Sequence, residues 1–180
     1  PTKKLFATAW STDGKTLLTV PDAPGNEMRV WDVSDVDNPK VRQVLDGVPD
    51  GVQIVGAGDL SPDGTLIVGG GLKGHVVGWR QQADGRWVRT FATSLGSTVI
   101  ESLRFADDTH VFYVDDDNRA LLVDVSGPDA VVSQSFEGVE ALPLVAATVP
   151  GKGLYAAGLD SGETLLWAAG SAAPIATIPG

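Results

Sequence analysis

Three consecutive aspartates and an asparagine, Asp115 to Asn118, form a cluster of potential metal ligands. Their oxygens are the hard ligands that calcium prefers, but a calcium loop also needs a glycine at its sixth position and a bidentate glutamate at its twelfth. Counted from Asp115, those positions hold Ala120 and Ser126. The run therefore predicts a solvated turn, because Asp and Asn favour turns, with a loosely held cation as the alternative.

A glycine-rich stretch, GGGLKG at 69–74, fits the spacing G-x-G-x-x-G of dinucleotide-binding loops. In such loops the glycines bring backbone N–H groups close to a pyrophosphate at the start of a helix. Here the next residues, His75 to Trp79, have the pattern of a β-strand, so no helix follows. The stretch therefore predicts a hairpin turn.

The remaining nucleophiles and bases are few. The two histidines, His75 and His110, lie in neither an H-E-x-x-H nor a nucleophile-elbow context. The sequence contains no cysteine, which excludes disulfides, thiolate metal sites and a cysteine nucleophile. A hydrolase triad would also need an exposed serine on a tight strand-to-helix turn, which the sequence lacks. We therefore expect a protein that is not an enzyme and that holds no cofactor.

Composition and charge narrow the possible partners. The formal net charge of −10 over 180 residues repels phosphate backbones and anionic lipid surfaces. No apolar run approaches the ~18 residues of a membrane span, and residues 1–4 do not lead into a secretory signal. We expect a cytoplasmic protein that binds neither nucleic acid nor membranes.

The elements that position these residues repeat along the chain. Turn-type clusters occur at 11–14, 61–64, 106–109 and 150–153, each between two apolar stretches. A bulky residue ends a later strand in each period, at Trp31, Trp79, Val123 and Trp167, which are 48, 44 and 44 residues apart by subtraction. Short alternating strands follow at 41–45, 87–91, 131–136 and 175–178. These landmarks indicate four repeats.

Each repeat is predicted to hold four short strands. In the first repeat they are Leu5–Trp10, Leu17–Val20, Met28–Val33 and Val41–Leu45. Four antiparallel strands per repeat of about 40 to 45 residues are typical of a propeller blade. The predicted fold is an all-β β-propeller, with four blades of four antiparallel strands at about 1–46, 47–93, 94–137 and 138–180.

Two stretches, 60–66 (LSPDGTL) and 28–33 (MRVWDV), resemble the most recognisable motifs of the WD-repeat family. The first repeat, with WDVSD at 31–35 and Asn38-Pro39, is similar to bacterial WD-repeat proteins of the actinobacterial type. This resemblance implies a ring of seven or eight blades and a role in protein binding. Arg80 and Ala168 stand where the family has the aspartate, and no Gly-His pair precedes a first strand. We therefore expect its His–Ser/Thr–Asp–Trp hydrogen-bond network to be incomplete in every blade.

Acidic residues concentrate on one face of the predicted propeller. In this fold, loops from the second to the third strand and from the fourth strand to the next blade gather on one side. The candidate partner-binding residues there are Asp22, Glu27, Asp46, Asp50, Asp115, Asp116, Asp117, Glu137, Glu140 and Asp160. With Glu163, eleven carboxylates face two cations, Lys73 and Arg119, whereas the opposite loops carry eight carboxylates and four cations. Such a field favours a basic partner, and solubility is the alternative reason for it.

Three functions remain open on this evidence. The first is a non-enzymatic interaction scaffold that binds a protein or peptide through the acidic loops. The second is a calcium-dependent propeller hydrolase or lactonase-like enzyme, since the fold alone does not exclude one. The third is an architectural segment of a larger regulatory protein. Because four blades of this type subtend about half a circle, we expect further blades, a companion chain or a homodimer to complete the ring, with a tight four-bladed ring as the remaining alternative.

Overall fold

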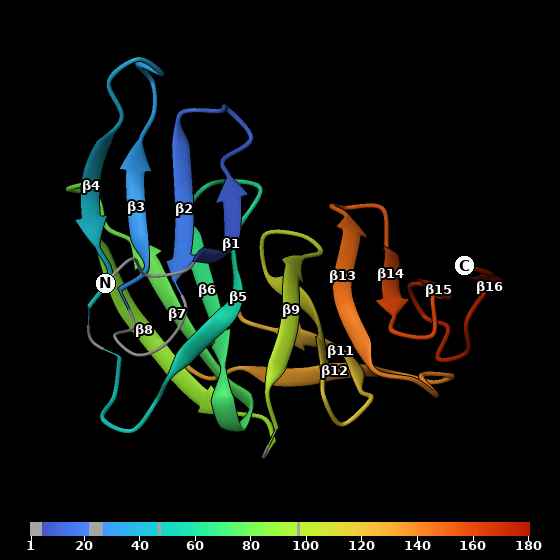
Figure 1. Ribbon diagram of the computed structural model, residues 1–180. Coiled ribbons are helices and arrows are strands. Elements are labelled where there is room, and N and C mark those ends of the chain that lie inside the picture. Colours follow the sequence, from blue (N-terminus) through green and yellow to red (C-terminus); the bar gives the residue numbers. More distant parts are fainter. Residues whose placement is uncertain (1–4, 22–26, 47, 97) are drawn as a thin grey trace.

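The computed structural model describes residues 5–21, 27–46, 48–96 and 98–180. They form four antiparallel sheets of four strands each, and within every sheet the strands follow one another in chain order. Figure 1 shows the sheets one after another from the blue to the red end of the chain. The all-β prediction and the four blades of antiparallel strands in a propeller arrangement are thereby confirmed.

The blades are numbered along the chain. Blade 1 holds β1 (Leu5–Trp10), β2 (Thr16–Pro21), β3 (Arg29–Asp32) and β4 (Lys40–Val44). Blade 2 holds β5 (Ile54–Leu60), β6 (Leu66–Gly71), β7 (His75–Gln81) and β8 (Trp87–Ser94). Blade 3 holds β9 (Ile100–Phe105), β10 (His110–Asp115), β11 (Ala120–Asp124) and β12 (Val131–Phe136). Blade 4 holds β13 (Pro143–Val149), β14 (Leu154–Leu159), β15 (Thr164–Ala168) and β16 (Ala176–Ile178).

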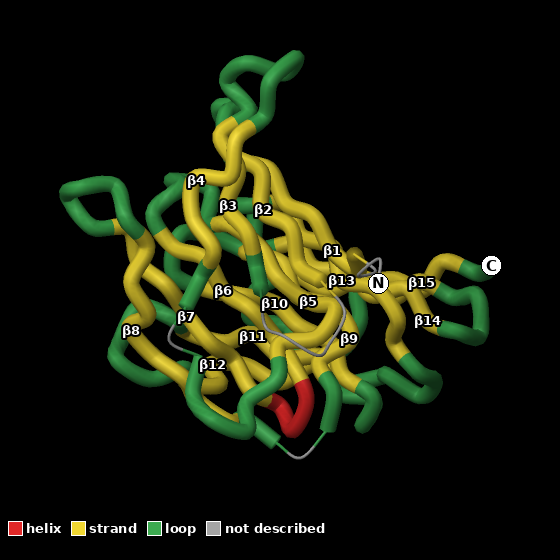
Figure 2. Tube along the Cα trace, turned by 60° about the vertical axis from the view of Figure 1, so that its left-hand side comes forward, coloured by secondary structure: helices red, strands yellow, loops and turns green. Residues whose placement is uncertain are grey.

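The glycine-rich stretch forms the turn that its sequence predicts. Strand β6 ends at Gly71, and one turn of 3-10 helix, η1 (Leu72–Gly74), leads directly into β7. Lys73 and Gly74 have positive φ angles of 57° and 62°, which reverse the chain. Figure 2 shows η1 as the one red segment. Among the described residues no helix is long and apolar enough to cross a membrane.

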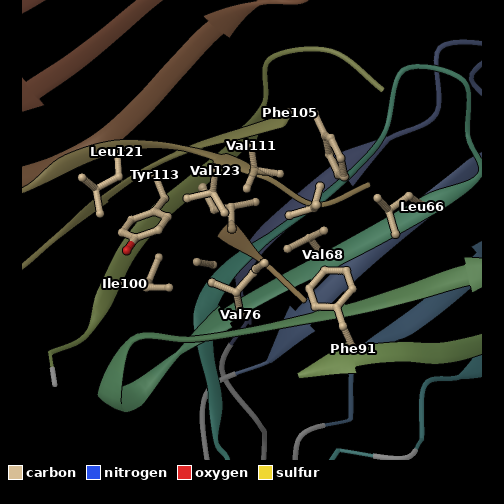
Figure 3. Packing of buried hydrophobic residues seen from close by; sticks show 14 residues of the cluster. Leu66, Val68, Val76, Phe91, Ile100, Phe105, Val111, Tyr113, Leu121 and Val123 are labelled. Atoms are coloured by element: carbon tan, nitrogen blue, oxygen red, sulfur yellow. The ribbon is translucent and has the colours of Figure 1, made fainter. Parts of the chain in front are cut away.

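Neighbouring blades pack first strand against first strand, and the facing surfaces of their sheets also pack together. Strand β1 contacts β5, β5 contacts β9, and β9 contacts β13, whereas the described parts of β1 and β13 have no comparable contact. Three apolar clusters fill the three junctions between consecutive blades. Figure 3 shows the cluster between blades 2 and 3, to which Leu66 and Phe91 of blade 2 and Phe105 and Tyr113 of blade 3 all contribute. The core therefore lies between blades rather than within one sheet.

The repeated tryptophans connect blades through their indole nitrogens. Trp79 Nε1 donates a hydrogen bond to the carbonyl of Asp46 in the preceding connection (2.7 Å), and Trp167 Nε1 donates to the carbonyl of Glu137 (3.1 Å). Trp31 instead donates to Thr19 Oγ1 within its own blade (3.0 Å). Glycine, tyrosine and alanine stand where blade 1 has Thr19, in register with the later strands. A bond between the tryptophan and a strand hydroxyl is thus a feature of blade 1.

Candidate interaction surface

The loops that carry most of the predicted site residues lie together on one face of the arc. We call this the acidic loop face: the loops β2–β3, β4–β5, β6–β7, β8–β9, β10–β11, β12–β13 and β14–β15. Neighbouring loops on it are joined by backbone hydrogen bonds, from Leu95 N to Gly74 O (2.9 Å) and from Asp116 N to Val99 O (3.1 Å). Because the strands alternate in direction, successive blades place these loops on the same side.

Most of the predicted carboxylates on this face are exposed. The exposed members are Asp46, Asp50, Asp116, Asp117, Glu137, Glu140 and Asp160, together with Glu163. Lys73 is exposed among them, so eight carboxylates face a single exposed lysine on the described loops. Glu27 is half-buried and forms an ion pair with Arg29 (3.1 Å), which neutralises its charge. Asp22 lies outside the described residues.

Asp115 does not belong to the exposed set. Its side chain is fully buried, and its carboxylate forms an ion pair with Arg119, whose Nε donates to Oδ2 at 2.9 Å. The backbone N–H groups of Asp117 and Arg119 donate to its other oxygen. The physical reason is its place in the fold: Asp115 is the last residue of β10, a strand buried on both faces, in which Tyr113 and Val114 are both fully buried. Asp115 therefore holds the β10–β11 turn and offers no charge to a partner.

A carboxylate that the sequence analysis did not include lies beside this turn. Glu101 is half-buried on β9, and burial together with the nearby charge of Asp116 raises its pKa. Asp116 in turn accepts a hydrogen bond from Val99 N at 2.8 Å, which joins the β10–β11 and β8–β9 loops. A lone glutamate within a strand gave no sequence signal. Its position adds negative potential beside Asp116.

Aspartates on the opposite face have a different role, because the turns use them. The hydrogen bond from the Ser11 side chain, with the Lys15 N–H, lowers the pKa of Asp13. Burial alone would raise the pKa of Asp63, but hydrogen bonds from Ser61 and Thr65 outweigh it and lower the value. These carboxylates replace backbone partners that a tight turn leaves unpaired.

More carboxylates of that face are engaged in the same way. Burial of Asp107 is likewise outweighed by hydrogen bonds from Thr109 and His110, so its pKa is lowered. Asp108 Oδ1 accepts a hydrogen bond from Asp63 N across the junction of blades 2 and 3 (2.8 Å). By contrast, six loop-face carboxylates accept no hydrogen bond on their side chains and form no ion pair with any described residue: Asp46, Asp50, Asp117, Glu137, Glu140 and Asp160.

The remaining candidate groups are possible metal ligands and the two histidines. The described residues contain no group of three or more His, Asp or Glu side chains arranged to hold a metal ion. His75 Nδ1 lies 2.8 Å from the carbonyl of Leu72 in the η1 turn, and His110 lies beside Asp107. Both histidines are therefore bound to their own turns. The arrangement of free carboxylates can attract cationic groups.

A depression of about 320 Å³ lies where the first strands of the four blades end on the opposite face. Asp59 and Arg104 line it together with Trp10 and Thr148. The two carboxylate oxygens of Asp59 accept hydrogen bonds from the N–H groups of Leu60 (2.9 Å) and Phe105 (2.8 Å), although burial raises its pKa. Asp59 thus joins blade 2 to blade 3 and is not a free recognition group.

No family model matches this chain, and no curated protein matches it significantly.

Proposed function

We propose that this chain is a non-enzymatic interaction scaffold of the WD-repeat kind, of bacterial type, which binds a basic protein or peptide through the acidic loop face. The observation that carries the proposal is the contrast between its two faces. Most aspartates on the opposite face accept hydrogen bonds within the turns, with Asp37 and Asp129 as the exceptions, whereas six carboxylates on the acidic loop face are exposed and accept nothing from the described residues. Charges that the fold does not need are available to a partner.

The electrostatic consequences favour such a partner. Eight exposed carboxylates around one lysine create a continuous negative field over the described loops. A field of this kind speeds the encounter with cationic surfaces and discourages acidic ones, including nucleic acids and anionic membranes. Because the groups are exposed, salt screens them over a Debye length of about 8 Å at physiological ionic strength. Binding should therefore weaken as salt is added.

The same proposal includes a larger ring and a cytoplasmic location. The four blades pack in sequence order, and the described parts of β1 and β13 have no comparable contact. WD-type rings are larger than four blades, so we propose that these blades are part of a ring of seven or eight. The acidic loop face would then be one rim of that ring.

A pair of matched variants tests the role of the face. The loop-face variant combines Glu137→Gln, Glu140→Gln and Asp160→Asn, and the control variant combines Asp35→Asn, Asp37→Asn and Asp129→Asn on the opposite face. Both remove three negative charges, and the six residues are all exposed. Binding of a fluorescent lysine-rich peptide is measured by anisotropy at 50 and 300 mM salt, with a glutamate-rich peptide of equal length as the negative probe.

The loop-face variant should bind the lysine-rich peptide about tenfold more weakly at low salt, since each exposed charge contributes roughly 0.2–1 kcal/mol. The control variant should bind like the wild type. Equal weakening of both variants would show that net charge alone matters and would overturn the proposal.

Calcium gives a separate check, because a ligand of the folded state must raise the melting midpoint. An interaction scaffold predicts no rise at millimolar calcium, and the hydrolase alternative predicts one.

A further inference from the structure

A second depression on the face opposite the acidic loop face lies between blades 1 and 2. Its volume is about 310 Å³, and small-molecule sites usually have about 300–1,000 Å³. The β1–β2 turn and β4 of blade 1 line one side, and the β5–β6 turn with the adjoining ends of β7 and β8 lines the other. Both walls belong to a junction that is complete within this chain, because the apolar cluster of blades 1 and 2 closes it below.

A buried hydrogen-bond donor without an acceptor lines this depression. Trp87 is only 2% exposed, yet its Nε1 has no hydrogen-bond partner among the described residues. The buried Trp79 and Trp167, by contrast, both donate to backbone carbonyls. Gln43 holds the backbone of Trp87 in place, since it accepts from the N–H (2.8 Å) and donates to the carbonyl (2.7 Å). An unpaired buried donor destabilises a fold, so an acceptor supplied by a ligand would be favoured here.

Three more residues of the lining have hydrogen-bonding groups that no described residue uses. Arg42 is exposed, makes one long hydrogen bond to the carbonyl of Gly85 (3.5 Å) and forms no ion pair with a described residue. Asp13 accepts hydrogen bonds through Oδ1 within its own turn, which leaves Oδ2 available. Gln81 Nε2 donates to the Gly85 carbonyl (3.2 Å), which leaves Oε1 available. The depression thus offers donors and acceptors together.

A bridge that ties blade 2 to blade 3 is absent from this junction. Asp32 of blade 1 and Arg80 of blade 2 occupy equivalent positions in the sheet register. Arg80 crosses to blade 3 and donates to the carbonyls of Val125 (3.0 Å) and Ser126 (2.8 Å). Asp32 instead accepts hydrogen bonds from Ser34 in its own loop. Protein groups therefore tie the later junction at this position, whereas the junction of blades 1 and 2 keeps polar groups for a ligand.

We propose that this depression binds a neutral, hydroxyl-rich small molecule of the saccharide or polyol class. A hydroxyl group both accepts and donates hydrogen bonds. It can therefore accept from Trp87 Nε1 and from Arg42, and its own hydrogen can go to Asp13 or Gln81. A simple anion would meet the carboxylates of Asp13 and Asp63, and a simple cation would meet the Arg42 guanidinium. A neutral ligand with hydroxyl groups suits both kinds of protein group.

The Trp87 indole gives a direct readout of such binding. The chain contains five tryptophans, so their indole N–H signals can be followed separately in a proton–nitrogen correlation spectrum of isotopically labelled protein. The signal of Trp87 is identified by its loss in the Trp87→Phe variant. Wild-type protein is titrated with glucose, galactose, mannose and ribose, and separately with sodium phosphate and ethylammonium chloride as charged probes.

At least one of the sugars should move the Trp87 indole proton downfield, because formation of a hydrogen bond deshields it. The dissociation constant should lie in the millimolar range expected for a few hydrogen bonds to a small ligand. The indole signals of the other tryptophans should stay in place, since those residues do not line the depression, except Trp10, which is exposed and serves as the reference for non-specific effects. Phosphate and ethylammonium should leave the Trp87 signal unchanged.

A matched pair of variants checks the site itself. Arg42→Ala removes a donor from the lining, and the control Arg89→Ala removes an arginine on β8 that does not line the depression. Both positions are exposed, so folding should persist, and each variant loses one positive charge. Arg42→Ala should weaken sugar binding about tenfold, the effect of losing a hydrogen bond from a charged group. Arg89→Ala should bind like the wild type.

Three results would overturn the proposal. The first is that none of the four sugars moves the Trp87 signal, because the indole would then be satisfied by water alone. The second is a charged probe that moves it as strongly as a sugar, because charge and not hydroxyl groups would then select the ligand. The third is equal weakening by both arginine variants. No residue of the lining belongs to the acidic loop face, so failure of this site leaves the outcome of the peptide-binding assay untouched.

Discussion

The junctions between blades and the surfaces that face outward are built from the same residue types, yet the fold uses them differently. Trp79 is fully buried at a junction and hydrogen-bonded across it, whereas Trp10 of blade 1 is exposed. Asp115 is buried under a turn, whereas Asp117, two residues later, is exposed and accepts nothing on its side chain. Residue type alone therefore does not say which side chains stabilise this fold. The neighbouring blade or turn decides it, as in other repeat proteins whose units contact only their neighbours.

The largest effect should come from a junction tryptophan. Trp79→Ala removes a fully buried indole and its hydrogen bond to Asp46 O, so it should lower the free energy of unfolding by about 3–5 kcal/mol. Trp10→Ala, at an exposed position, should lower it by less than about 1 kcal/mol. Urea unfolding of both variants, followed by far-UV circular dichroism, measures the difference. Similar losses for both would contradict the distinction between the junction tryptophan and the exposed one.

A smaller effect should follow from the buried ion pair. Asp115→Asn leaves the Arg119 guanidinium without its carboxylate and should cost about 2 kcal/mol, below the 3–5 kcal/mol of a fully buried pair because Arg119 is partly exposed. The matched change Asp117→Asn should stay within about 0.5 kcal/mol. Both are read from the same urea titration. If Asp117→Asn proved the more costly change, the placement of the β10–β11 turn would be wrong.

Acid should separate the turn aspartates from the free carboxylates. The folded-state pKa values of Asp63 and Asp107 are lowered from an ordinary value of 3.8, so both side chains stabilise the fold above that value. This contribution is lost as the pH falls below about 4 and the carboxylates become protonated. The double variant Asp63→Asn, Asp107→Asn should therefore show a shallower fall of the melting midpoint between pH 5 and 3 than the wild type.

The matched acid control uses Asp37→Asn with Asp129→Asn, whose carboxylates accept no hydrogen bond from the described residues. This control should follow the wild-type curve of melting midpoint against pH. A control that flattened as much as the turn variant would show that overall charge, not the turns, sets the acid sensitivity.

The smallest effect on stability should come from the acidic loop face. The triple variant Glu137→Gln, Glu140→Gln, Asp160→Asn removes charges that no described residue contacts, so its free energy of unfolding should change by less than about 0.5 kcal/mol. A small gain is expected, since like charges repel. Thermal unfolding in low salt measures it. A loss above 1 kcal/mol would mean that these carboxylates serve the fold and not a partner.

Local turn chemistry made most of this fold predictable. Strand β1 was expected at Leu5–Trp10 and is found there, because the Ser-x-Asp-Gly turn that follows ends it through side-chain hydrogen bonds. The strand expected at Met28–Val33 is observed as Arg29–Asp32. Such boundaries depend on residues close in sequence, and the fourth strands expected at 131–136 and 175–178 are likewise observed, as β12 (Val131–Phe136) and β16 (Ala176–Ile178).

The site was less predictable because exposure depends on neighbours distant in sequence. A run of three aspartates looks uniformly solvated, and nothing in the run itself separates Asp115, which ends a strand buried on both faces, from the exposed Asp116 and Asp117. The burial of Tyr113 is itself evident only in the structure. There, burial raises its pKa to about 12, and its hydroxyl lacks a hydrogen-bond partner among the described residues. The acceptors of the tryptophan indoles belong to the preceding connection in two blades and to Thr19 in one, a choice that no single motif encodes.

The spacing of the bonds between blades has a consequence for synthesis on the ribosome. Gln43 and Trp87 bond at a separation of 44 residues, and Asp59 and Phe105 at 46, so each seam closes only after one further repeat has been made. At roughly 5–20 residues per second, a newly made blade would wait about 2–9 seconds until the next blade covers its apolar face. During synthesis the growing chain would therefore always expose one apolar blade face. Chaperones could bind this face, or a neighbouring nascent chain could misassemble with it.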